Sequence, residues 1–325
     1  YINYQCLKIK MMFVTLLAKV FNHLPDKSFD HIDCCFSGLY EIPQKLRWRT
    51  KMKFIFTVYD LTPILFPQYF ELSDPKKHFL YKAFTNIKKD WKVFCISKCT
   101  KKDFLNFRPD FPAENTFVSL LAASESFYKC NSENKFMQVR EKYNLPESGE
   151  YILSLCTLEP RKNLVTLLLA FDEYVKRTGN EKVKLVLTGN KGWQYDEIIQ
   201  KANSPELQGR VILTGFVADE DLASLYSNSI MFIYVSIYEG FGLPILEAMK
   251  CGCAVISSNT SSMPEVGGDS VAYTNPADIN EISNIIERLA TDEIYRNELA
   301  MRALKRSGEF NWQKTAARII EEITC

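Results

Sequence analysis

The sequence predicts an α/β protein of two domains, in which parallel sheets are covered by helices on both faces. Its 325 residues exceed what one ordinary hydrophobic core accommodates. Short apolar runs rich in β-branched residues alternate with helical patterns, as in a buried parallel sheet. The halves also differ in charge: residues 1–149 carry 23 Lys and Arg against 15 Asp and Glu, whereas residues 150–325 carry 17 against 24.

The second half shows the alternation most clearly. Its predicted strands are Tyr151–Cys156, Val183–Thr188, Val211–Thr214, Ile230–Val235 and Cys253–Ser257. Its predicted helices are Leu164–Arg177, Tyr195–Ala202, Glu220–Asn228, Leu243–Lys250 and Ile279–Ala290, followed by an amphipathic helix at Phe310–Ile323. Ligands of such sheets bind at the carboxyl ends of the strands, so the residues that follow the strands are the first candidates for a site.

The first half follows the same pattern less regularly. Its predicted strands are Ile32–Phe36, Lys53–Val58, Val93–Ile96 and Thr116–Leu120. Helical patterns lie near residues 7–21, 75–90 and 98–107. The stretch Asn144–Gly149 reads as a linker because it contains Pro146 and Gly149.

Composition argues against membrane-spanning, zinc-binding and disulfide-rich classes. No apolar run reaches the roughly 18–20 residues that a bilayer requires. The run Met11–Ala18 is interrupted by Lys19 and lacks a cleavage site, which favours a buried helix over a signal peptide. Ten Cys form no CxxC pair and only three His are present, so we expect no metal site. Scattered thiols are typical of a reducing cytoplasm.

The basic first half suggests an anionic surface or substrate on that side. Its local clusters are Arg47-Trp-Arg49-Thr-Lys51-Met-Lys53 and Lys98 with Lys101-Lys102. A solvated basic face explains the same residues, because Lys-rich exposed faces are common.

The strongest motif is Glu239-Gly-Phe-Gly-Leu-Pro-Ile-Leu-Glu247, which follows a predicted strand and opens a predicted helix. Gly240 and Gly242 allow a ligand to approach the backbone, and Pro244 suits a first helical turn. The helix amides favour an anion, whereas the two carboxylates favour hydroxyl groups. A nucleotide-sugar offers both, although either Glu taken alone is better explained as a structural charge.

The second motif, Glu159-Pro160-Arg161-Lys162-Asn163, directly follows the strand Tyr151–Cys156. Asn163 can cap the next helix. Cations are disfavoured at a helix start, so Arg161 and Lys162 make sense there if a diphosphate binds between them. An isolated Arg-Lys pair would more simply be solvated.

Two further motifs follow strands in the second half. Gly189-Asn-Lys-Gly192-Trp193 reads as a glycine-rich turn, in which Trp193 packs or contacts a ligand. Ser262-x-x-Glu265 reads as a capping box, a role that needs no ligand.

Taken together, these motifs resemble retaining glycosyltransferases of family 4, which have the GT-B fold. The match runs through residues 151–322. It includes Glu159–Asn163, Gly189–Trp193, Thr214-Gly-Phe216, Tyr238–Met249, Met263-Pro-Glu-Val266 and Phe310-Asn-Trp312. The resemblance implies two Rossmann-like domains that face a cleft: an acceptor domain at 1–148, a donor domain at 149–308 and a final helix at 309–325 that returns toward the first domain.

The resemblance also implies roles for individual residues. Arg161 and Lys162 would hold the donor diphosphate, and Glu247 would bind its ribose. Glu239 would bind the transferred sugar with the amides of Gly240, Phe241, Gly242 and Leu243. Val217 would lie near the base. Metal and cofactor are not expected.

The first half matches the family more loosely. The segment Thr57-Val-Tyr59-Asp60-Leu61 resembles one in which His precedes a catalytic Asp, so Asp60 is a catalytic candidate and Tyr59 replaces the His. Phe36 corresponds to another family His. The opening strand and glycine-rich loop are not visible, so we expect an N-terminally incomplete first domain.

The resemblance implies a retaining hexosyltransferase, first of all a mannosyltransferase, that builds O-antigen, capsule or a similar polysaccharide. Its partners would be a nucleoside-diphosphate-sugar donor and a lipid-linked or oligosaccharide acceptor, with no nucleic acid. It would be cytoplasmic, with peripheral contact to the inner face of the membrane. Two alternatives stay open: an inactive GT-B binding subunit and a nucleoside-diphosphate-sugar epimerase.

Overall fold

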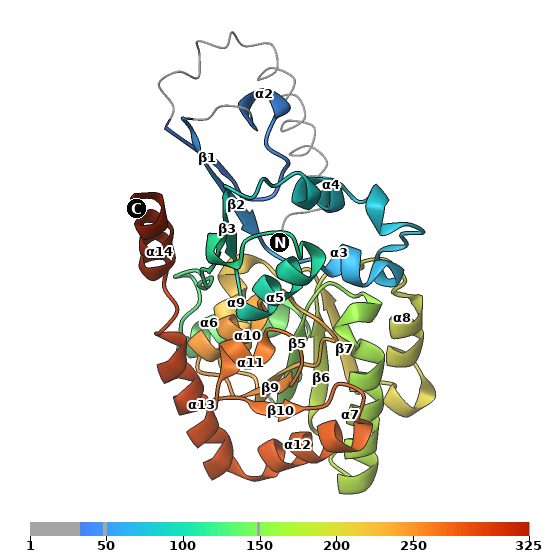
Figure 1. Cartoon of the computed structure of the whole chain (residues 1–325). Helices are drawn as coiled ribbons and strands as arrows, with labels where there is room; N and C mark the ends of the chain where they lie inside the picture. The colour runs from blue at the N-terminus through green and yellow to red at the C-terminus, as the bar shows by residue number, and fades with distance from the viewer. Residues whose placement is uncertain (1–32, 48–50, 148–149, 325) are drawn as a thin grey trace.

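A computed structural model of the chain describes residues 33–47, 51–147 and 150–324, which form two parallel β-sheets stacked one above the other (Figure 1). The smaller sheet has the strand order β1-β2-β3-β4, and the larger has the order β10-β9-β8-β5-β6-β7. Every strand pairing is parallel. The predicted α/β class is therefore confirmed, whereas the predicted helix near residues 7–21 lies outside the described residues.

The smaller layer is built from short elements. Its strands are β1 (Cys34–Ser37), β2 (Lys53–Val58), β3 (Lys92–Cys95) and β4 (Thr116–Val118), and its helices are α2 (Gln44–Arg47), α3 (Thr62–Leu65), α4 (Phe79–Thr85) and α5 (Lys98–Phe107). The single helix predicted near 75–90 is wrong. The backbone is extended at His78, which separates a 3-10 turn from α4 and accepts the N–H of Leu80 on Nδ1.

The larger layer contains all the strands and helices predicted for it and further helices that were not predicted. Its strands are β5 (Tyr151–Leu155), β6 (Lys184–Thr188), β7 (Val211–Gly215), β8 (Met231–Tyr234), β9 (Val255–Ser258) and β10 (Ala272–Thr274). Its helices are α6 (Glu133–Lys142), α7 (Leu164–Thr178), α8 (Asp196–Ala202), α9 (Asp219–Ser227), α10 (Leu243–Lys250), α11 (Met263–Gly267), α12 (Ile279–Thr291) and α13 (Glu293–Ser307).

Helix ends in this layer follow ordinary capping chemistry. The side chains of Asp278 and Asp292 accept N–H groups at the starts of α12 and α13. Helix α7 ends at Gly179, whose left-handed backbone (φ 67°) suits a residue without Cβ.

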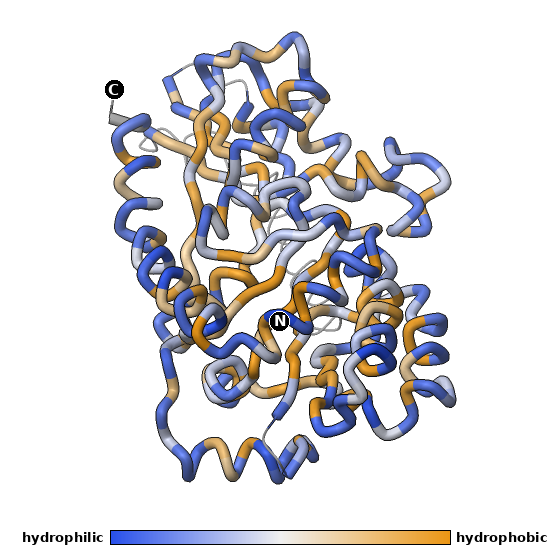
Figure 2. The backbone as a smooth tube through the Cα atoms, turned by 90° about the horizontal axis from the view of Figure 1, so that it is seen from below, coloured by the Kyte–Doolittle hydropathy of each residue, from blue (hydrophilic) through white to orange (hydrophobic). Residues whose placement is uncertain are grey.

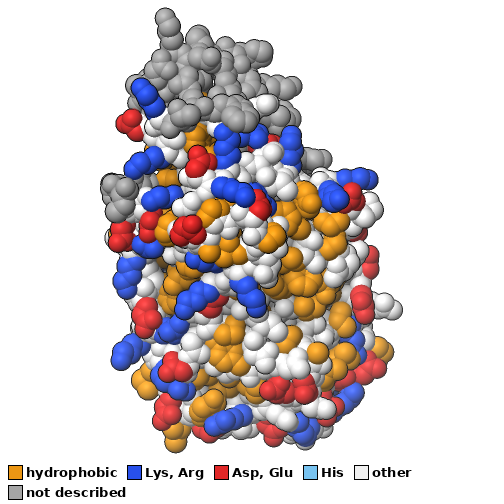
Figure 3. Space-filling view, in the orientation of Figure 1, with side chains coloured by type: hydrophobic (Ala, Val, Ile, Leu, Met, Phe, Trp, Pro, Cys, Tyr) orange, Lys and Arg blue, Asp and Glu red, His pale blue; other side chains and the backbone are white. Residues whose placement is uncertain are grey.

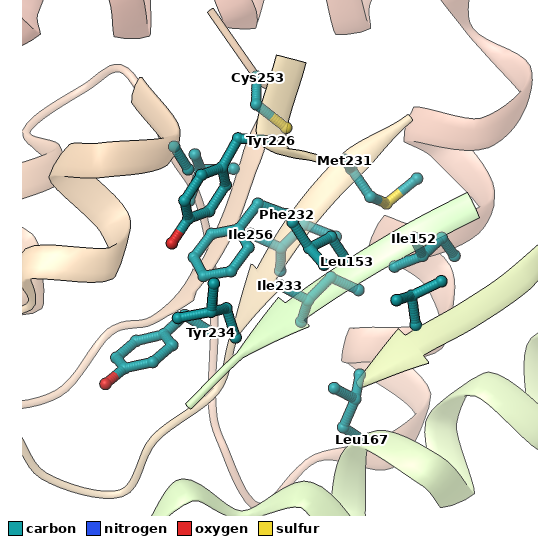
Figure 4. Close-up of a cluster of buried hydrophobic side chains, with 14 of the residues drawn as sticks. Ile152, Leu153, Leu167, Tyr226, Met231, Phe232, Ile233, Tyr234, Cys253 and Ile256 are labelled. Carbon is teal, nitrogen blue, oxygen red and sulfur yellow. The ribbon is translucent and has the colours of Figure 1, made fainter. Parts of the chain in front are cut away.

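The core of the larger layer explains why its strands are apolar on both faces. Ile152, Leu153, Phe232 and Ile233 come from the neighbouring strands β5 and β8, and Leu167 packs on them from α7 (Figure 4). All five side chains are fully buried. The outer helices, in contrast, alternate between polar and apolar stretches along the tube in Figure 2, as expected for helices that cover a sheet.

The strand order of the larger sheet reverses between β5 and β8. After β5 the chain continues through β6 and β7 on one side of the sheet, whereas β8, β9 and β10 extend it on the other side. The loops that follow β5 and β8 therefore leave the same edge of the sheet in opposite directions. Such a reversal creates a crevice outside the carboxyl ends of the strands.

Helix α6 packs on the larger layer through one buried carboxylate. The carboxylate of Asp221 on α9 accepts hydrogen bonds from the ammonium groups of Lys135 and Lys142 on α6, the second at 2.7 Å. It also accepts the hydroxyl of Tyr143 at 2.8 Å. Burial alone would raise the pKa of Asp221, but these three partners hold it near 2. Ala123 and Val139 likewise join the larger hydrophobic core.

The last helix, α14 (Trp312–Thr324), lies beside the smaller sheet (Figure 1). Thr315 donates its hydroxyl to the carbonyl of Leu120 at 2.6 Å, and Ser119 donates to the carbonyl of Thr315 at 3.2 Å. Lys92 of β3 pairs with Glu322 at 3.3 Å. The chain thus passes between the two layers twice, near residues 119–123 and 308–312.

Candidate active site at the strand-order reversal

The loops that follow β5 and β8 bring together three charged side chains that the sequence motifs indicate, Arg161, Lys162 and Glu239. Arg161 and Lys162 lie in a 3-10 turn, Pro160–Lys162, that follows β5. Glu239 lies in the loop between β8 and α10. The structure therefore brings both motifs into contact, although they are more than 70 residues apart.

One oxygen of Glu239 holds this cluster together. Its Oε1 atom lies 2.6 Å from Lys162 Nζ and 2.9 Å from Arg161 Nη1. The hydroxyls of Ser236 and Tyr234 donate to the same oxygen at 2.6 and 2.9 Å. Among the described residues, the second oxygen, Oε2, accepts no hydrogen bond. This oxygen is available to a ligand hydroxyl.

The neighbouring charges keep Glu239 ionised. Burial by itself would raise the pKa of Glu239, but Lys162 and Arg161 lower it to about 2. Burial opposes the charge on Arg161 too, yet Glu239 and Glu159 raise the pKa of its guanidinium above the usual value. The cluster thus carries permanent charges in a site that is largely shielded from water, where electrostatic interactions are stronger than in solution.

Arg161 is fixed by three acceptors and keeps one donor unused. Its Nη1 donates to the carbonyl of Tyr238 at 2.7 Å, and its Nη2 pairs with Glu159 at 2.8 Å. Its Nε is buried and has no acceptor among the described residues. Buried donors are rarely left unpaired, so the N–H at Nε is a candidate donor to a ligand.

The start of α10 offers backbone donors beside the cluster. Gly242 is in the left-handed region (φ 107°). Pro244 lies in the first turn of α10, where a backbone N–H has no acceptor within the helix, so the missing N–H of proline costs nothing. Within the described residues, the amides of Gly240, Phe241, Gly242 and Leu243 donate no hydrogen bond. Free amides and the helix dipole together favour an anion at this point.

Glu247 lies on α10, apart from the charged cluster. Its Oε2 accepts the hydroxyl of Tyr226 at 3.1 Å. Burial raises the pKa of Glu247 to about 7, against the opposing effect of that hydrogen bond. The two carboxylates of the motif therefore have contrasting protonation behaviour, Glu239 being charged throughout and Glu247 titrating near neutrality.

The smaller layer closes the crevice through Tyr59 and Asp60. A Cβ placed on Gly240 would lie 2.3 Å from the carbonyl oxygen of Tyr59 and 2.7 Å from Asp60 Cβ, so only glycine fits there. Burial raises the pKa of Asp60, while Arg161 and the N–H of Thr62, 3.0 Å from Oδ1, oppose the rise. Asp60 thus lies within the electrostatic reach of Arg161 and Glu239.

Two predicted capping roles are wrong. Ser262 makes no cap on α11 and instead donates to the carbonyls of Glu239 and Phe241, while Glu265 accepts two amides of α5. Asn163 is in the left-handed region (φ 60°), and its side-chain amide donates to Val235 and Pro276. For Ser262 and Glu265, backbone groups distant in sequence compete successfully with the local helix start. For Asn163, the side-chain oxygen accepts the hydroxyl of Thr166 at 2.7 Å in place of a backbone N–H.

The remaining predicted residues contribute less directly. Val217 is buried in the core, whereas its neighbour Phe216 is 53% exposed, and the placement of a base near Val217 stays a prediction. The Phe241 side chain packs on Phe310, so Phe241 can contribute only its backbone to the site. Trp193 packs against Phe70 of the smaller layer, with ring centroids 5.3 Å apart.

The sequence analysis missed several residues of the site. Tyr234 and Ser236 contact Glu239 directly, and their position at the carboxyl end of β8 could have indicated them. His78 is near enough to Asp60 for that carboxylate to raise the pKa of the imidazole, although burial lowers it overall. Local sequence gave no signal for His78, because the contact depends on how α4 packs.

The described residues contain neither a metal-binding cluster nor a membrane-spanning helix. No group of three or more His, Cys, Asp or Glu side chains in them is arranged to hold a metal ion. None of their helices is both long enough and apolar enough to cross a bilayer.

Comparison with known proteins gives a consistent result. The family described as "Glycosyl transferases group 1" matches residues 136–306. The chain is 32% identical over 280 residues to the serotype-specific mannosyltransferase WbdA of Escherichia coli, covering 85% of this chain and 33% of WbdA. It is 37% identical over 211 residues to O-antigen chain mannosyltransferase B of Escherichia coli, covering 65% of this chain and 55% of that protein. The chain thus spans about a third to a half of these relatives.

Solved structures share the fold at lower identity. HepE of Anabaena in complex with UDP and glucose superposes with a TM-score of 0.70 at 22% identity, covering 84% of this chain and 72% of HepE. A glycosyltransferase of Rickettsia africae superposes with a TM-score of 0.72 at 18% identity, covering 95% of this chain and 79% of that protein. These likenesses concern the arrangement of the two sheets.

Proposed function

Because the chain belongs to the glycosyl transferases group 1 family and has the GT-B fold, we propose that it transfers a hexose with retention of anomeric configuration. The donor is a nucleoside-diphosphate sugar, first of all one that carries mannose, since the relatives WbdA and O-antigen chain mannosyltransferase B are mannosyltransferases. The observation that carries the proposal is the cluster of Arg161, Lys162 and Glu239 beside the free amides of α10.

In this proposal the cationic and anionic side chains of the site bind different parts of the donor. Arg161 and Lys162 hold the diphosphate, whereas the free oxygen of Glu239 and the amides of Gly240–Leu243 bind the transferred sugar. Glu247 binds the ribose, and the base lies near Val217. This division resolves the contradiction of having an acid next to an anion, because the acid faces hydroxyl groups.

The reaction breaks the bond between sugar C1 and the diphosphate oxygen and forms a bond from C1 to the acceptor oxygen. Negative charge increases on the departing diphosphate, where fixed positive groups stabilise it most effectively. The acceptor proton passes to the leaving phosphate. Asp60, near Arg161 and Glu239, contributes to the field around the reacting carbon.

The acceptor is a lipid-linked or oligosaccharide hydroxyl bound on the side of the smaller layer, and the product belongs to a surface polysaccharide such as O-antigen or capsule. We propose that the acceptor domain ends near residues 119–123 instead of at 148/149, because Ala123, Phe127 and Val139 already belong to the larger core, and that 309–325 returns to the first domain. The enzyme works in the cytoplasm, peripherally at the inner face of the membrane.

A donor panel tests the proposal. The protein is titrated with GDP-mannose, UDP-glucose and dTDP-glucose in a thermal-shift assay, and transfer to a mannose-terminated oligosaccharide is followed by mass spectrometry. Stabilisation by one donor together with a product one hexose heavier supports the proposal. Binding without a transferred or hydrolysed sugar favours an inactive subunit, to which the replacement of two family His residues by Tyr59 and Phe36 points. Free nucleotide without an acceptor-linked product favours an epimerase.

Activity should not depend on a divalent metal. Arg161, Lys162 and the start of α10 supply the positive field that a metal gives in other transferases. We therefore expect the same turnover in excess EDTA as in untreated enzyme. Loss of turnover in EDTA, with recovery on adding Mg²⁺ or Mn²⁺, would contradict this prediction.

A further inference from the structure

The amino end of α5 in the smaller layer is held by a carboxylate from the larger layer. Glu265 Oε2 accepts the N–H of Lys98 at 2.7 Å, and Oε1 accepts the N–H of Cys99 at 2.7 Å. The N–H of Thr100 is paired with Ser97 Oγ at 2.9 Å. The first turn of α5 is thus paired, and two of its three bonds come from a residue more than 160 positions away.

The same turn of α5 grips the loop that contains Glu239. Ser97 and Thr100 donate their hydroxyls to the carbonyl of Gly240 at 2.8 and 3.1 Å. Both hydroxyls are buried, and the glycine itself lies against Tyr59 and Asp60. The position of α5 therefore affects the backbone next to the sugar-binding carboxylate.

The segment that carries Glu265 grips this loop from the opposite side. Ser261 Oγ accepts the N–H of Glu239 at 3.0 Å, and Ser262 donates to the carbonyls of Glu239 and Phe241 at 2.8 and 2.9 Å. Arg306 fixes the backbone of this segment by donating to the carbonyl of Glu265 at 2.8 Å. One short segment therefore joins the donor loop to α5.

We propose that Glu265 is a positioning residue for the transfer reaction: by closing on α5, it holds the smaller layer against Gly240 and fixes the loop 239–243 in its reactive geometry. The inference rests on the proposed function and adds a residue that touches neither donor nor acceptor. The contacts proposed for the nucleotide come from the larger layer alone. Loss of the Glu265 contact should therefore reduce turnover and leave nucleotide affinity intact.

Removing either partner of the contact tests the proposal. Glu265→Gln leaves one oxygen to accept an amide, and its NH₂ group meets the second N–H, so both bonds weaken. Lys98→Pro removes one N–H without breaking the helix, because Lys98 is the first residue of α5 and the preceding Ser97 is extended. Lys98→Ala is the matched variant for Lys98→Pro, since it loses the ammonium group and keeps the N–H.

The expected result is a split between kcat and nucleotide binding. A lost charge-assisted hydrogen bond corresponds to a roughly 10- to 150-fold loss, so kcat for GDP-mannose should fall by at least about tenfold in Glu265→Gln and in Lys98→Pro relative to Lys98→Ala. The affinity for free GDP should stay within about threefold of wild type. The double variant should be little worse than the single variants, because both break one contact. Glu298→Gln, which removes an exposed carboxylate on α13, controls for charge.

Hydrogen exchange at the amides of Lys98 and Cys99 gives a readout that does not depend on activity. Exchange should accelerate in Glu265→Gln and stay unchanged in Glu298→Gln. Wild-type kcat in Glu265→Gln, or parallel loss of GDP affinity, overturns the proposed role. If the wild-type protein transfers no sugar, the proposed function fails, and unchanged exchange in Glu265→Gln would separately refute the contact.

Discussion

Glu239 is surrounded by the cations that the proposal assigns to the diphosphate. Lys162 and Arg161 both pair with its Oε1 atom. A bound diphosphate would attract the same two cations, while the sugar hydroxyls would take up the carboxylate. The ion cluster thus prepares the side chains for a ligand that contains both groups.

Mutation should separate the roles of these residues. Glu239→Gln removes the charge that pairs with Lys162 and Arg161, so affinity for free nucleoside diphosphate should stay equal or increase while turnover collapses. Arg161→Ala should weaken nucleotide binding and lower kcat/KM by roughly 10- to 150-fold, because its contact to the leaving group strengthens in the transition state. Calorimetric titration and a turnover assay measure both effects.

Arg161→Lys is the matched control, because it keeps the positive charge and loses the planar guanidinium. It should bind nucleotide more tightly than Arg161→Ala and less tightly than wild type. Thermal unfolding must accompany the Arg161 variants, because Arg161 also pairs with the buried Glu159. Wild-type turnover in Glu239→Gln, or normal nucleotide binding in Arg161→Ala, would show that the site is assigned incorrectly.

The second carboxylate should make donor binding depend on pH. Because burial raises the pKa of Glu247 to about 7, this group is mostly protonated at pH 6 and mostly ionised at pH 8. If the carboxylate accepts the ribose hydroxyls, affinity for a nucleoside-diphosphate sugar should increase about tenfold between these values. A sugar-linked diphosphate is the correct probe, since a terminal phosphate would itself titrate near neutrality. Glu247→Gln should flatten the profile, and tighter binding at pH 6 would contradict the assignment.

At the scale of elements, the contact between the Glu239 loop and the segment that follows β2 depends on the absence of a side chain at Gly240. Gly240→Ala would place Cβ 2.3 Å from a backbone oxygen of Tyr59, which cannot move as a side chain could. We expect the two layers to separate at this point and kcat/KM to fall roughly 5- to 150-fold, given a cost of about 1–3 kcal/mol for overpacking. Gly308→Ala is the matched control, because its Cβ meets only an ordinary contact at 3.4 Å. Equal activity of the two variants would contradict the prediction.

Sequence predicted the buried strands and the amphipathic helices α12 and α14 well, and the short or marginal elements poorly. The prediction Lys53–Val58 matches the observed ends of β2, since residues 54–58 are all buried and four of them are apolar. Strand β10 is only three residues long, and α13 exposes Ile294 and Met301, so neither gives a clear periodic signal. Helix α6 was missed too, because its place depends on Asp221 more than on a long apolar face.

The same limit applies to the site. Arg161, Lys162 and Glu239 could be selected from local motifs, since each follows a buried strand. Their mutual contact depends on the reversed strand order between β5 and β8, which no local pattern encodes. Glu265 was misassigned as a helix cap because its partners lie on α5, in the other layer.

At the scale of the whole molecule, the basic first half predicts attraction to anionic membranes. On the face drawn in Figure 3, basic and acidic side chains are intermixed, so the charge excess is spread over the surface. Lys53 and Lys102 are exposed, whereas Arg47 is largely buried beside Glu41. The exposed lysines are therefore the residues to test.

The double variant Lys53→Glu/Lys102→Glu should bind anionic vesicles less tightly than wild type. Each basic residue near such a surface contributes about 1 kcal/mol, so the loss should be at least tenfold at low salt and smaller at high salt. Cosedimentation with vesicles of neutral and anionic lipid measures the effect, and Lys305→Glu on α13 is the control in the larger layer. Equal binding of the wild-type protein to both kinds of vesicle would contradict a membrane role for this face.

The two passages of the chain between the layers lie next to each other. Thr315 and Leu120 share a hydrogen bond at 2.6 Å, and a groove there is lined by residues 118–121 and 309–311. Two bodies joined at adjacent points retain one easy degree of freedom, a rotation about the line through those points. The layers should therefore open and close by a hinge rotation about this line, and sliding of one layer over the other should be suppressed. Each closure then returns α5 to the same position against Gly240.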